Sequence, residues 1–153
     1  MRYNNRKRKR GRMMNERFLF RGKRKDNDEL VEGYLYITHD GKYEIAKYCD
    51  ETNIERIAYE VIPETVGQCT GLKDKHGKWI FEGDILNFVN DDDESSLYVV
   101  IWDTSLLSWQ VQEISHYIKN DYYGFDELCE FGDTEVIGNV YDNPELLQRS
   151  DEE

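Results

Sequence analysis

The amino-acid sequence predicts a single, mainly β domain of the β-rich α+β class. Its 153 residues include eleven Tyr, six Phe and three Trp, which favour strands and supply large apolar surfaces for a core. Only two Pro interrupt the chain, and short apolar stretches alternate with turn residues along most of it. A domain of about 150 residues buries roughly 70% of its extended-chain surface, so the chain has enough material for a core.

The first part of the chain predicts a hairpin and two flanking strands. A strand is expected at residues 18–20, and aromatic and β-branched residues predict two more at 30–37 and 43–48, joined by a turn at 39–42. A further strand is expected over 56–62. Pro63 limits it, because proline has no amide donor.

The centre of the chain predicts a second hairpin followed by a tight turn. Residues 65–72 and 79–81 flank the tip at 74–77, where Gly77 suits a positive-φ turn. We interpret Glu82-Gly83-Asp84 as a turn that opens a strand over 85–89. The competing interpretation makes Glu82 and Asp84 an acid/base or metal-binding pair, but no His ligand or orienting partner accompanies them in the sequence.

The acidic run at residues 90–96 predicts a solvated hairpin tip. It joins strands expected at 85–89 and 97–102, and it lacks the spaced ligands and glycine of an EF-hand calcium loop. The next strand is expected over 109–114, although Ile114 breaks its alternation of inward and outward residues.

The last third predicts one or two short helices and a closing strand. Phe125, Leu128 and Cys129 lie at helical spacing and predict a short helix with one apolar side, which we interpret as packing. Tyr122 and Tyr123 would suit stacking on bases or partner side chains. A strand over 134–141 and a short helix from 143–144 follow, and residues 148–153 are expected to form an acidic, frayed tail.

The sequence assigns no catalytic, cofactor-binding or metal-binding residue. It has no GxSxG elbow, no phosphate loop, and no HExxH or CxxC spacing. An odd number of cysteines also fits poorly with a disulfide framework and favours a reducing cytoplasm. The cysteines are Cys49, Cys69 and Cys129, and the histidines, which we expect in turn or packing roles, are His39, His76 and His116.

Charge divides the chain sharply. Residues 1–25 hold twelve Lys or Arg and one acid, a net charge of +11, whereas residues 26–153 hold eight and 31, a net charge of −23. The basic cluster at 6–12 is suited to phosphate contacts, which predicts a nucleic-acid-binding arm. The interpretation that we favour is instead that residues 1–13 are translated leader and that synthesis begins at Met13 or Met14. Seven basic residues would then be lost, leaving a net charge of −19, and the arm would not exist.

Several islands of sequence carry a resemblance to a known family. They include 18–23, the segments 61–68 and 70–74, Phe81 to Ile85, and the closing stretch 135–146. Taken together, residues 14–147 resemble the YopX family of phage and prophage proteins, which implies one domain built as an SH3-like β-barrel or a related small barrel with hairpin extensions. The resemblance implies structural roles for the signature positions Pro63, Gly67, Gly71, Leu72, Asp74, Gly77, Glu82, Gly83, Asp84, Trp102, Gly138 and Asn139.

The expected function is a phage accessory protein that binds a host or phage protein without catalysis, in the cytoplasm of a bacterial cell. No apolar run approaches the roughly 20 residues needed to cross a bilayer. Two alternatives stay open: a nucleic-acid binder that uses the basic arm, and an acidic mimic of DNA charge. Exposed strand edges and aromatic residues also allow a homo-oligomer.

Overall fold

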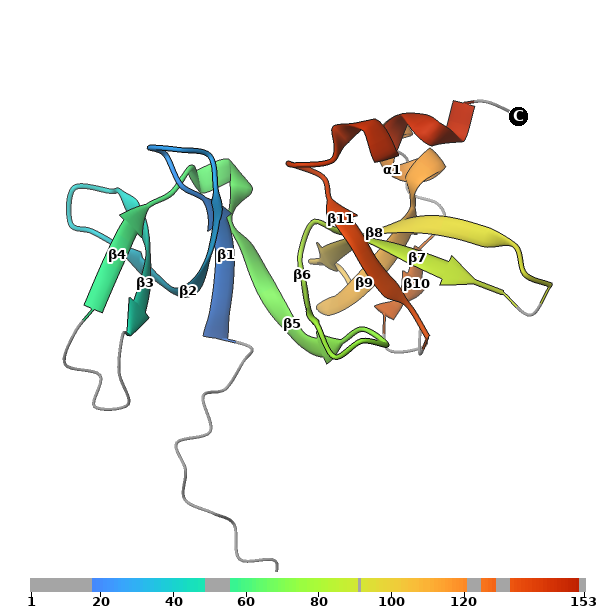
Figure 1. Ribbon diagram of the computed structural model, residues 1–153, viewed down its shortest axis with the longest axis horizontal. Helices are drawn as coiled ribbons and strands as arrows, with labels where there is room; N and C mark the ends of the chain where they lie inside the picture. Colours follow the sequence, from blue (N-terminus) through green and yellow to red (C-terminus); the bar gives the residue numbers. More distant parts are fainter. Residues whose placement is uncertain (1–17, 49–55, 91, 121–124, 129–132, 152–153) are drawn as a thin grey trace, which may run out of the picture.

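Two antiparallel sheets make up most of the protein. The computed structural model describes residues 18–48, 56–90, 92–120, 125–128 and 133–151. Figure 1 shows the first strands gathered at one side and the later strands with both C-terminal helices at the other, with β5 running between them. The prediction of a mainly β fold is confirmed.

The first sheet has six strands in the order β4-β3-β2-β1-β5-β6. The hairpin predicted at 30–37 and 43–48 is confirmed in both strands, with Leu35 opposite Ile45. A one-turn 3-10 helix, η2, at Pro63–Thr65 leads the chain from β4 into β5. The strands are β1 (Leu19–Lys23), β2 (Leu30–Ile37), β3 (Tyr43–Tyr48), β4 (Arg56–Glu60), β5 (Gly67–Lys73) and β6 (Trp79–Phe81).

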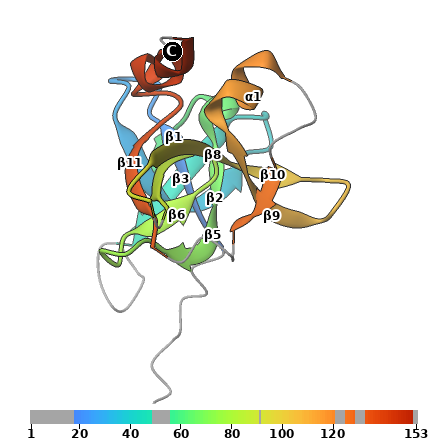
Figure 2. The ribbon, with the colours of Figure 1, turned by 90° about the vertical axis from the view of Figure 1, so that its right-hand side faces the viewer.

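The second sheet has five strands in the order β10-β9-β8-β7-β11. Its centre is the hairpin of β7 and β8. The predicted hairpin is confirmed, but its second strand begins at Ser95, which lies opposite Val89, and not at residue 97. The helix α1 (Ile114–Lys119) and the 3-10 helix η4 (Pro144–Asp151) lie beside each other at one end (Figure 2). The strands are β7 (Asp84–Val89), β8 (Ser95–Asp103), β9 (Ser108–Glu113), β10 (Phe125–Glu127) and β11 (Glu135–Asn139).

The closed, SH3-like barrel implied by the family resemblance is not confirmed. Among the described strands, each sheet ends in two edges: β4 and β6 in the first, β10 and β11 in the second. After β6 the chain turns sharply at Gly83, and β7 starts a new sheet instead of continuing the first one. The two sheets therefore stay open.

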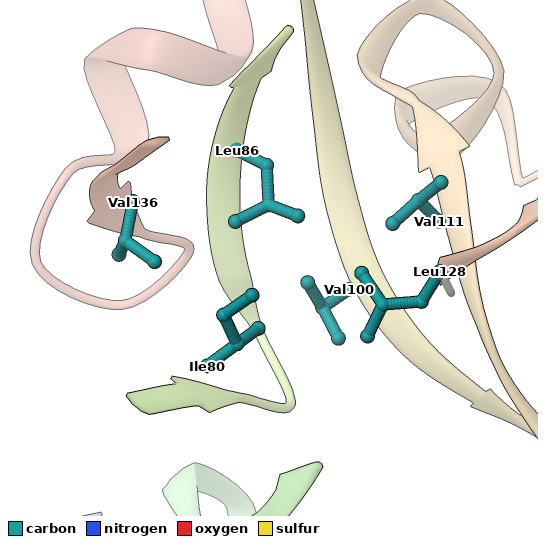
Figure 3. Close-up of a cluster of buried hydrophobic side chains, with 6 residues drawn as sticks. All are labelled: Ile80, Leu86, Val100, Val111, Leu128 and Val136. Atoms are coloured by element: carbon teal, nitrogen blue, oxygen red, sulfur yellow. The ribbon is translucent and has the colours of Figure 1, made fainter. Parts of the chain in front are cut away.

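The second sheet buries apolar residues on both faces. Neighbouring residues of one strand point to opposite faces, so Leu86 and Val100 enter one cluster while Ile85 and Val99 enter another. Tyr117 of α1 and Leu146 of η4 cover the second cluster. The first cluster comprises Ile80, Leu86, Val100, Val111, Leu128 and Val136 (Figure 3).

The first sheet has one smaller core. Among the described residues, its cluster has Val31, Ile45 and Val61 as buried members, and partly buried aromatic and aliphatic side chains pack around them. Strands β2 and β4 leave large apolar side chains partly in solvent: Ile37 of β2 is 51% exposed and Ile57 of β4 is 48% exposed.

The short helix expected around Phe125, Leu128 and Cys129 does not form at residues 125–127. Residues Phe125–Glu127 form β10 instead, with Phe125 opposite Gln112 of β9, and Leu128 lies in the buried cluster beside it. Pairing with a distant edge strand here overrides the local helical spacing, which three residues can satisfy by chance. Cys129 falls outside the described residues.

Ile114 breaks the alternation of β9 because it begins α1 and is no longer part of the strand. It packs on Ile85 and Val99, in the cluster under the helix. The predicted C-terminal helix is confirmed as the 3-10 helix η4, which starts at Pro144. In the described part of the chain, no helix has the length and apolar character to span a membrane.

Candidate functional site

The two sheets are joined at the turn of residues 82–84. Gly83 has a φ of +80°, a conformation that glycine adopts without strain. Its amide donates to the Val100 carbonyl at 2.8 Å, and its carbonyl accepts from the Val140 amide at 2.9 Å. The predicted turn is confirmed, and it is fixed to strand β8 on one side and to the chain after β11 on the other.

Asp84 links this turn to the first sheet through a buried ion pair. Its carboxylate accepts a hydrogen bond from the Arg21 guanidinium of β1 and another, at 2.8 Å, from the Phe81 amide. The same guanidinium lies over the Phe81 ring, 4.8 Å from its centroid. Burial raises the pKa of Asp84, and the positive charge of Arg21 opposes that shift. These partners occupy the carboxylate, so Asp84 connects the two sheets.

Gly67 allows β5 to pass close to the turn. A Cβ atom at this position would lie 2.6 Å from the Glu82 carbonyl oxygen, closer than van der Waals contact permits. The Glu82 amide donates to the Gln68 carbonyl at 2.9 Å. The close approach fixes the position of Glu82 relative to β5.

A groove of about 400 Å³ lies where β1 and β5 of the first sheet approach β8 and β9 of the second. Apolar and aromatic side chains dominate its lining, and one carboxylate contributes. The lining residues are Phe18, Gln68, Cys69, Glu82, Trp102 and Trp109.

Two tryptophans form one wall of the groove. Trp102 of β8 and Trp109 of β9 occupy directly opposed positions in the hairpin. Their ring centroids are 5.0 Å apart, with an angle of 69° between the ring planes. Trp102 is 41% exposed, and Phe18 at the first-sheet side is 59% exposed. The groove thus presents aromatic surface to solvent.

Among the described residues that line the groove, Glu82 is the one carboxylate, and it is only partly exposed. Burial raises its pKa above the ordinary value, while a hydrogen bond from the Gln68 amide opposes that shift. Burial also raises the pKa of Tyr117, and the negative charge of Glu82 adds to it. In the part of the chain that the structure describes, no Lys, Arg or His forms an ion pair with Glu82.

Glu82 and Asp84 therefore have different surroundings, although the sequence places them two residues apart. Asp84 is fully buried against Arg21, whereas Glu82 faces the groove without a described cation. Within the described residues, no group of three or more His, Cys, Asp or Glu side chains is arranged to hold a metal ion. The geometry does not bring the two carboxylates together as an acid/base pair.

Several signature positions lie at the tip of the β5–β6 hairpin. Asp74 is buried there and accepts from the amides of His76 and Lys78, both at 2.9 Å, and from the Val136 amide at 3.2 Å. Burial would raise the pKa of Asp74, but these amides hold it below the ordinary value. Gly77 has a φ of +82°. The hairpin tip is thereby fixed to β11.

Further signature positions lie in other turns and strands. Gly71 has a φ of +82°, and Leu72 beside it is 39% exposed. Asn139 accepts from the amides of Tyr141 and Asp142, both at 3.0 Å, which shapes the turn into η4. Pro63 begins η2.

Gly138 accommodates the side chain of Asn143, since an added Cβ would lie 2.5 Å from the Asn143 Oδ1 atom.

Three of the cysteines and histidines predicted to have no reactive role are placed as follows. Cys69 is fully buried at the base of the groove, and Cys49 and Cys129 lie outside the described residues. His39 and His76 are exposed, and the Nε2 atom of His76 lies 3.5 Å from a Glu135 carboxylate oxygen. Tyr122, Tyr123 and the basic cluster at 6–12 also fall outside the described residues.

The sequence analysis assigned no site role to Arg21, Phe18 or Trp109, although the resemblance to the family includes them. Arg21 had a detectable signal, because a charged residue within the apolar run 18–22 requires either exposure or a buried partner. Nothing in the sequence identifies Asp84, 63 residues away, as that partner. The pairing of Trp102 with Trp109 follows from the register of the β8–β9 hairpin. It could have been predicted from the two strands expected at 97–102 and 109–114.

A family model described as YopX protein matches residues 19–148. No curated protein matches the chain. Among solved structures, the chain is similar to the crystal structure of protein EF1440 from Enterococcus faecalis, at 21% sequence identity and a TM-score of 0.47. That alignment covers 84% of this chain and 96% of the other. The family match covers most of the chain, whereas the structural likeness is too weak to bear on the site.

Proposed function

The chain belongs to the YopX family, and on that premise we propose that it is a non-catalytic binding module whose partner is a protein. The proposal rests mainly on the groove between the two sheets. Exposed aromatic side chains in a concave site are typical of protein recognition, because they bury large areas at little cost in conformational entropy. Phe18 and Trp102 are both more than a third exposed there.

The charge of the chain supports a basic partner. Residues 26–153 carry a net charge of −23, and such a field accelerates association with a positively charged surface. Exposed carboxylates occur on both sheets and their turns, among them Asp26, Asp28, Glu29, Asp92, Asp93, Glu94, Glu113, Asp126 and Glu127.

The biological setting that we propose is the cytoplasm of a bacterial host cell, where a phage or prophage accessory protein would meet its target. Immobilised protein should retain a basic protein from bacterial lysate after nuclease treatment. The purified pair should then bind less tightly as the salt concentration rises from about 0.05 M to about 0.5 M, because salt screens exposed charges. Affinity that stays constant over this range would contradict electrostatic recognition.

A second candidate, mimicry of nucleic-acid charge, is favoured by the same net charge of −23. It requires that the partner be a DNA-binding protein and that duplex DNA compete for the same surface. Competition by duplex DNA would support mimicry, and unchanged binding would reject it. The simpler alternative is that this negative charge only maintains solubility.

The hypothesis of a nucleic-acid-binding arm predicts that the chain itself binds DNA or RNA. If the basic residues at 6–12 form such an arm, the full chain retains DNA or RNA and deletion of residues 2–12 abolishes retention. Retention by the shortened chain would reject the arm.

A homo-oligomer would appear as a mass above 18.3 kDa in sedimentation.

A further inference from the structure

The groove combines an acid with aromatic faces, which is the chemistry that recognises an organic cation. A cation is attracted to the face of a tryptophan ring, and a partly desolvated carboxylate adds a charge-assisted hydrogen bond. Glu82, Trp102 and Trp109 all line the same space of about 400 Å³. That volume falls in the range of sites that enclose a whole ligand group.

The negative charge of Glu82 is not compensated within the described part of the protein. Two cations of β1 are engaged elsewhere, Arg21 with Asp84 and Lys23 with Asp142. A carboxylate that is partly removed from water without a cationic partner is unfavourable. A cation that enters the groove would remove that cost.

We propose that this groove binds an arginine side chain from a basic segment of the partner protein, with the guanidinium against Trp102 and Trp109 and hydrogen-bonded to Glu82. The inference rests on the proposed function, since it assumes a protein partner. Arginine fits better than lysine, because a planar guanidinium stacks on aromatic rings and donates two parallel hydrogen bonds to one carboxylate. A phosphate group does not fit, because Glu82 would repel it.

The test uses the full chain and a synthetic peptide with several arginines separated by glycines. Binding is followed by tryptophan fluorescence, because two of the three tryptophans line the groove. A matched peptide carries citrulline, which has nearly the shape of arginine without its charge. The arginine peptide should bind, and the citrulline peptide should bind at least about tenfold more weakly because it lacks the charge-assisted contact.

The variant Glu82→Gln should weaken binding of the arginine peptide by about tenfold. The control Glu113→Gln removes the same charge from an exposed position on β9, outside the groove, and should change affinity less than about twofold. The variant Trp102→Leu should weaken binding by about three- to thirtyfold through loss of the aromatic face.

A second readout separates this role from a structural one. Because burial raises the pKa of Glu82 in the folded protein, its ionised form destabilises the fold at neutral pH, and that effect disappears as pH falls below the ordinary value. Glu82→Gln should therefore keep or raise the thermal midpoint at pH 7 while it weakens peptide binding. A variant that lowers both would indicate a structural residue and overturn the proposal.

The remaining outcomes distinguish failure of the arginine proposal from failure of the proposed function. Equal losses in Glu82→Gln and Glu113→Gln, or equal binding of the citrulline peptide, would mean that the groove is not the site, while a protein partner would still stand. Absence of binding to the arginine peptide overturns the arginine proposal. The proposed function itself fails only if nuclease-treated lysate yields no protein that binds the chain after purification.

Discussion

The two sheets differ in how they are covered. The second sheet packs one face on Ile80 and Leu128 and the other under α1 and η4, so that its central strands are buried on both sides. In the described part of the first sheet, the main apolar cluster has three buried members, and the outermost strand, β4, exposes Ile57.

This difference indicates where the stability of the fold resides. Burial of apolar area is the largest favourable contribution to folding, so the second sheet should contribute more free energy of unfolding than the first. One wall of the groove, made by β8 and β9, therefore belongs to the more stable sheet. The position of the other wall depends on how the first sheet is attached to the second. That attachment includes the Arg21–Asp84 ion pair and the close contact of Gly67 with Glu82.

The largest effect is expected from cutting this attachment. Arg21→Met leaves Asp84 buried without a cation and should lower the free energy of unfolding by about 3–5 kcal/mol at pH 7. Urea denaturation measures this loss.

The pH dependence of the loss tests its cause. Burial already raises the pKa of Asp84 in the native protein, and removal of the opposing charge of Arg21 raises it further. Protonation then stabilises the variant as pH falls toward the ordinary carboxyl pKa of about 4. The deficit relative to the native protein should therefore shrink at low pH. A deficit that is constant with pH would contradict the ion-pair explanation.

A somewhat smaller loss is expected from opening a cavity in the second sheet. Leu86 is completely buried, and Leu86→Ala should cost about 2–5 kcal/mol of unfolding free energy. The matched change Ile45→Ala, also at a completely buried residue, tests the first sheet. We expect Leu86→Ala to increase amide exchange in both sheets and Ile45→Ala to increase it mainly in β1–β4. Identical exchange patterns would remove the distinction between the sheets.

The next effect concerns the glycine at the junction. Gly67→Ala forces a methyl group against the Glu82 carbonyl and should cost about 1–3 kcal/mol through overpacking. Gly41→Ala is the control, because the space around Gly41 is open and only its φ of +83° opposes a side chain. Thermal unfolding should rank Gly67→Ala as the more destabilising change, and the reverse order would contradict close packing at the junction.

The smallest effect is expected at the edge of the first sheet. Ile57→Ser replaces a residue that is 48% exposed on β4 and should change the free energy of unfolding by less than about 0.5 kcal/mol. Val99→Ser, at a fully buried position of the second sheet, should instead cost several times more. A large loss at Ile57 would show that the edge strand is covered in solution, for instance by a second copy.

Local patterns in the sequence predicted most strands but not their assembly. The hairpin of β2 and β3 follows from alternating residues around a turn, and β6 and β7 follow from apolar runs on both sides of Gly83. Strand β10 was missed because three residues carry little periodicity and its partner, β9, supplies the hydrogen bonds. The division into two sheets depends on Gly67 and the turn at Gly83, which no periodicity reports.

The groove was less predictable than the strands. Trp102 was recognised only as a signature position, and Glu82 as a signature position or as half of a pair with Asp84. That Trp102 and Glu82 line one groove depends on how β5 and β8 approach each other. The partner of Arg21 was equally hidden, since long-range ion pairs leave no local pattern. The chemistry of a site between two sheets becomes visible only when both sheets are placed.

Residue-resolved amide hydrogen exchange of the free, full-length protein tests the unequal stability of the two sheets most directly. The structure predicts that the amides of β7, β8 and β9 exchange only through global unfolding, while those of β3 and β4 exchange faster through partial opening of the first sheet. Equal protection of β3 and β8 would contradict it.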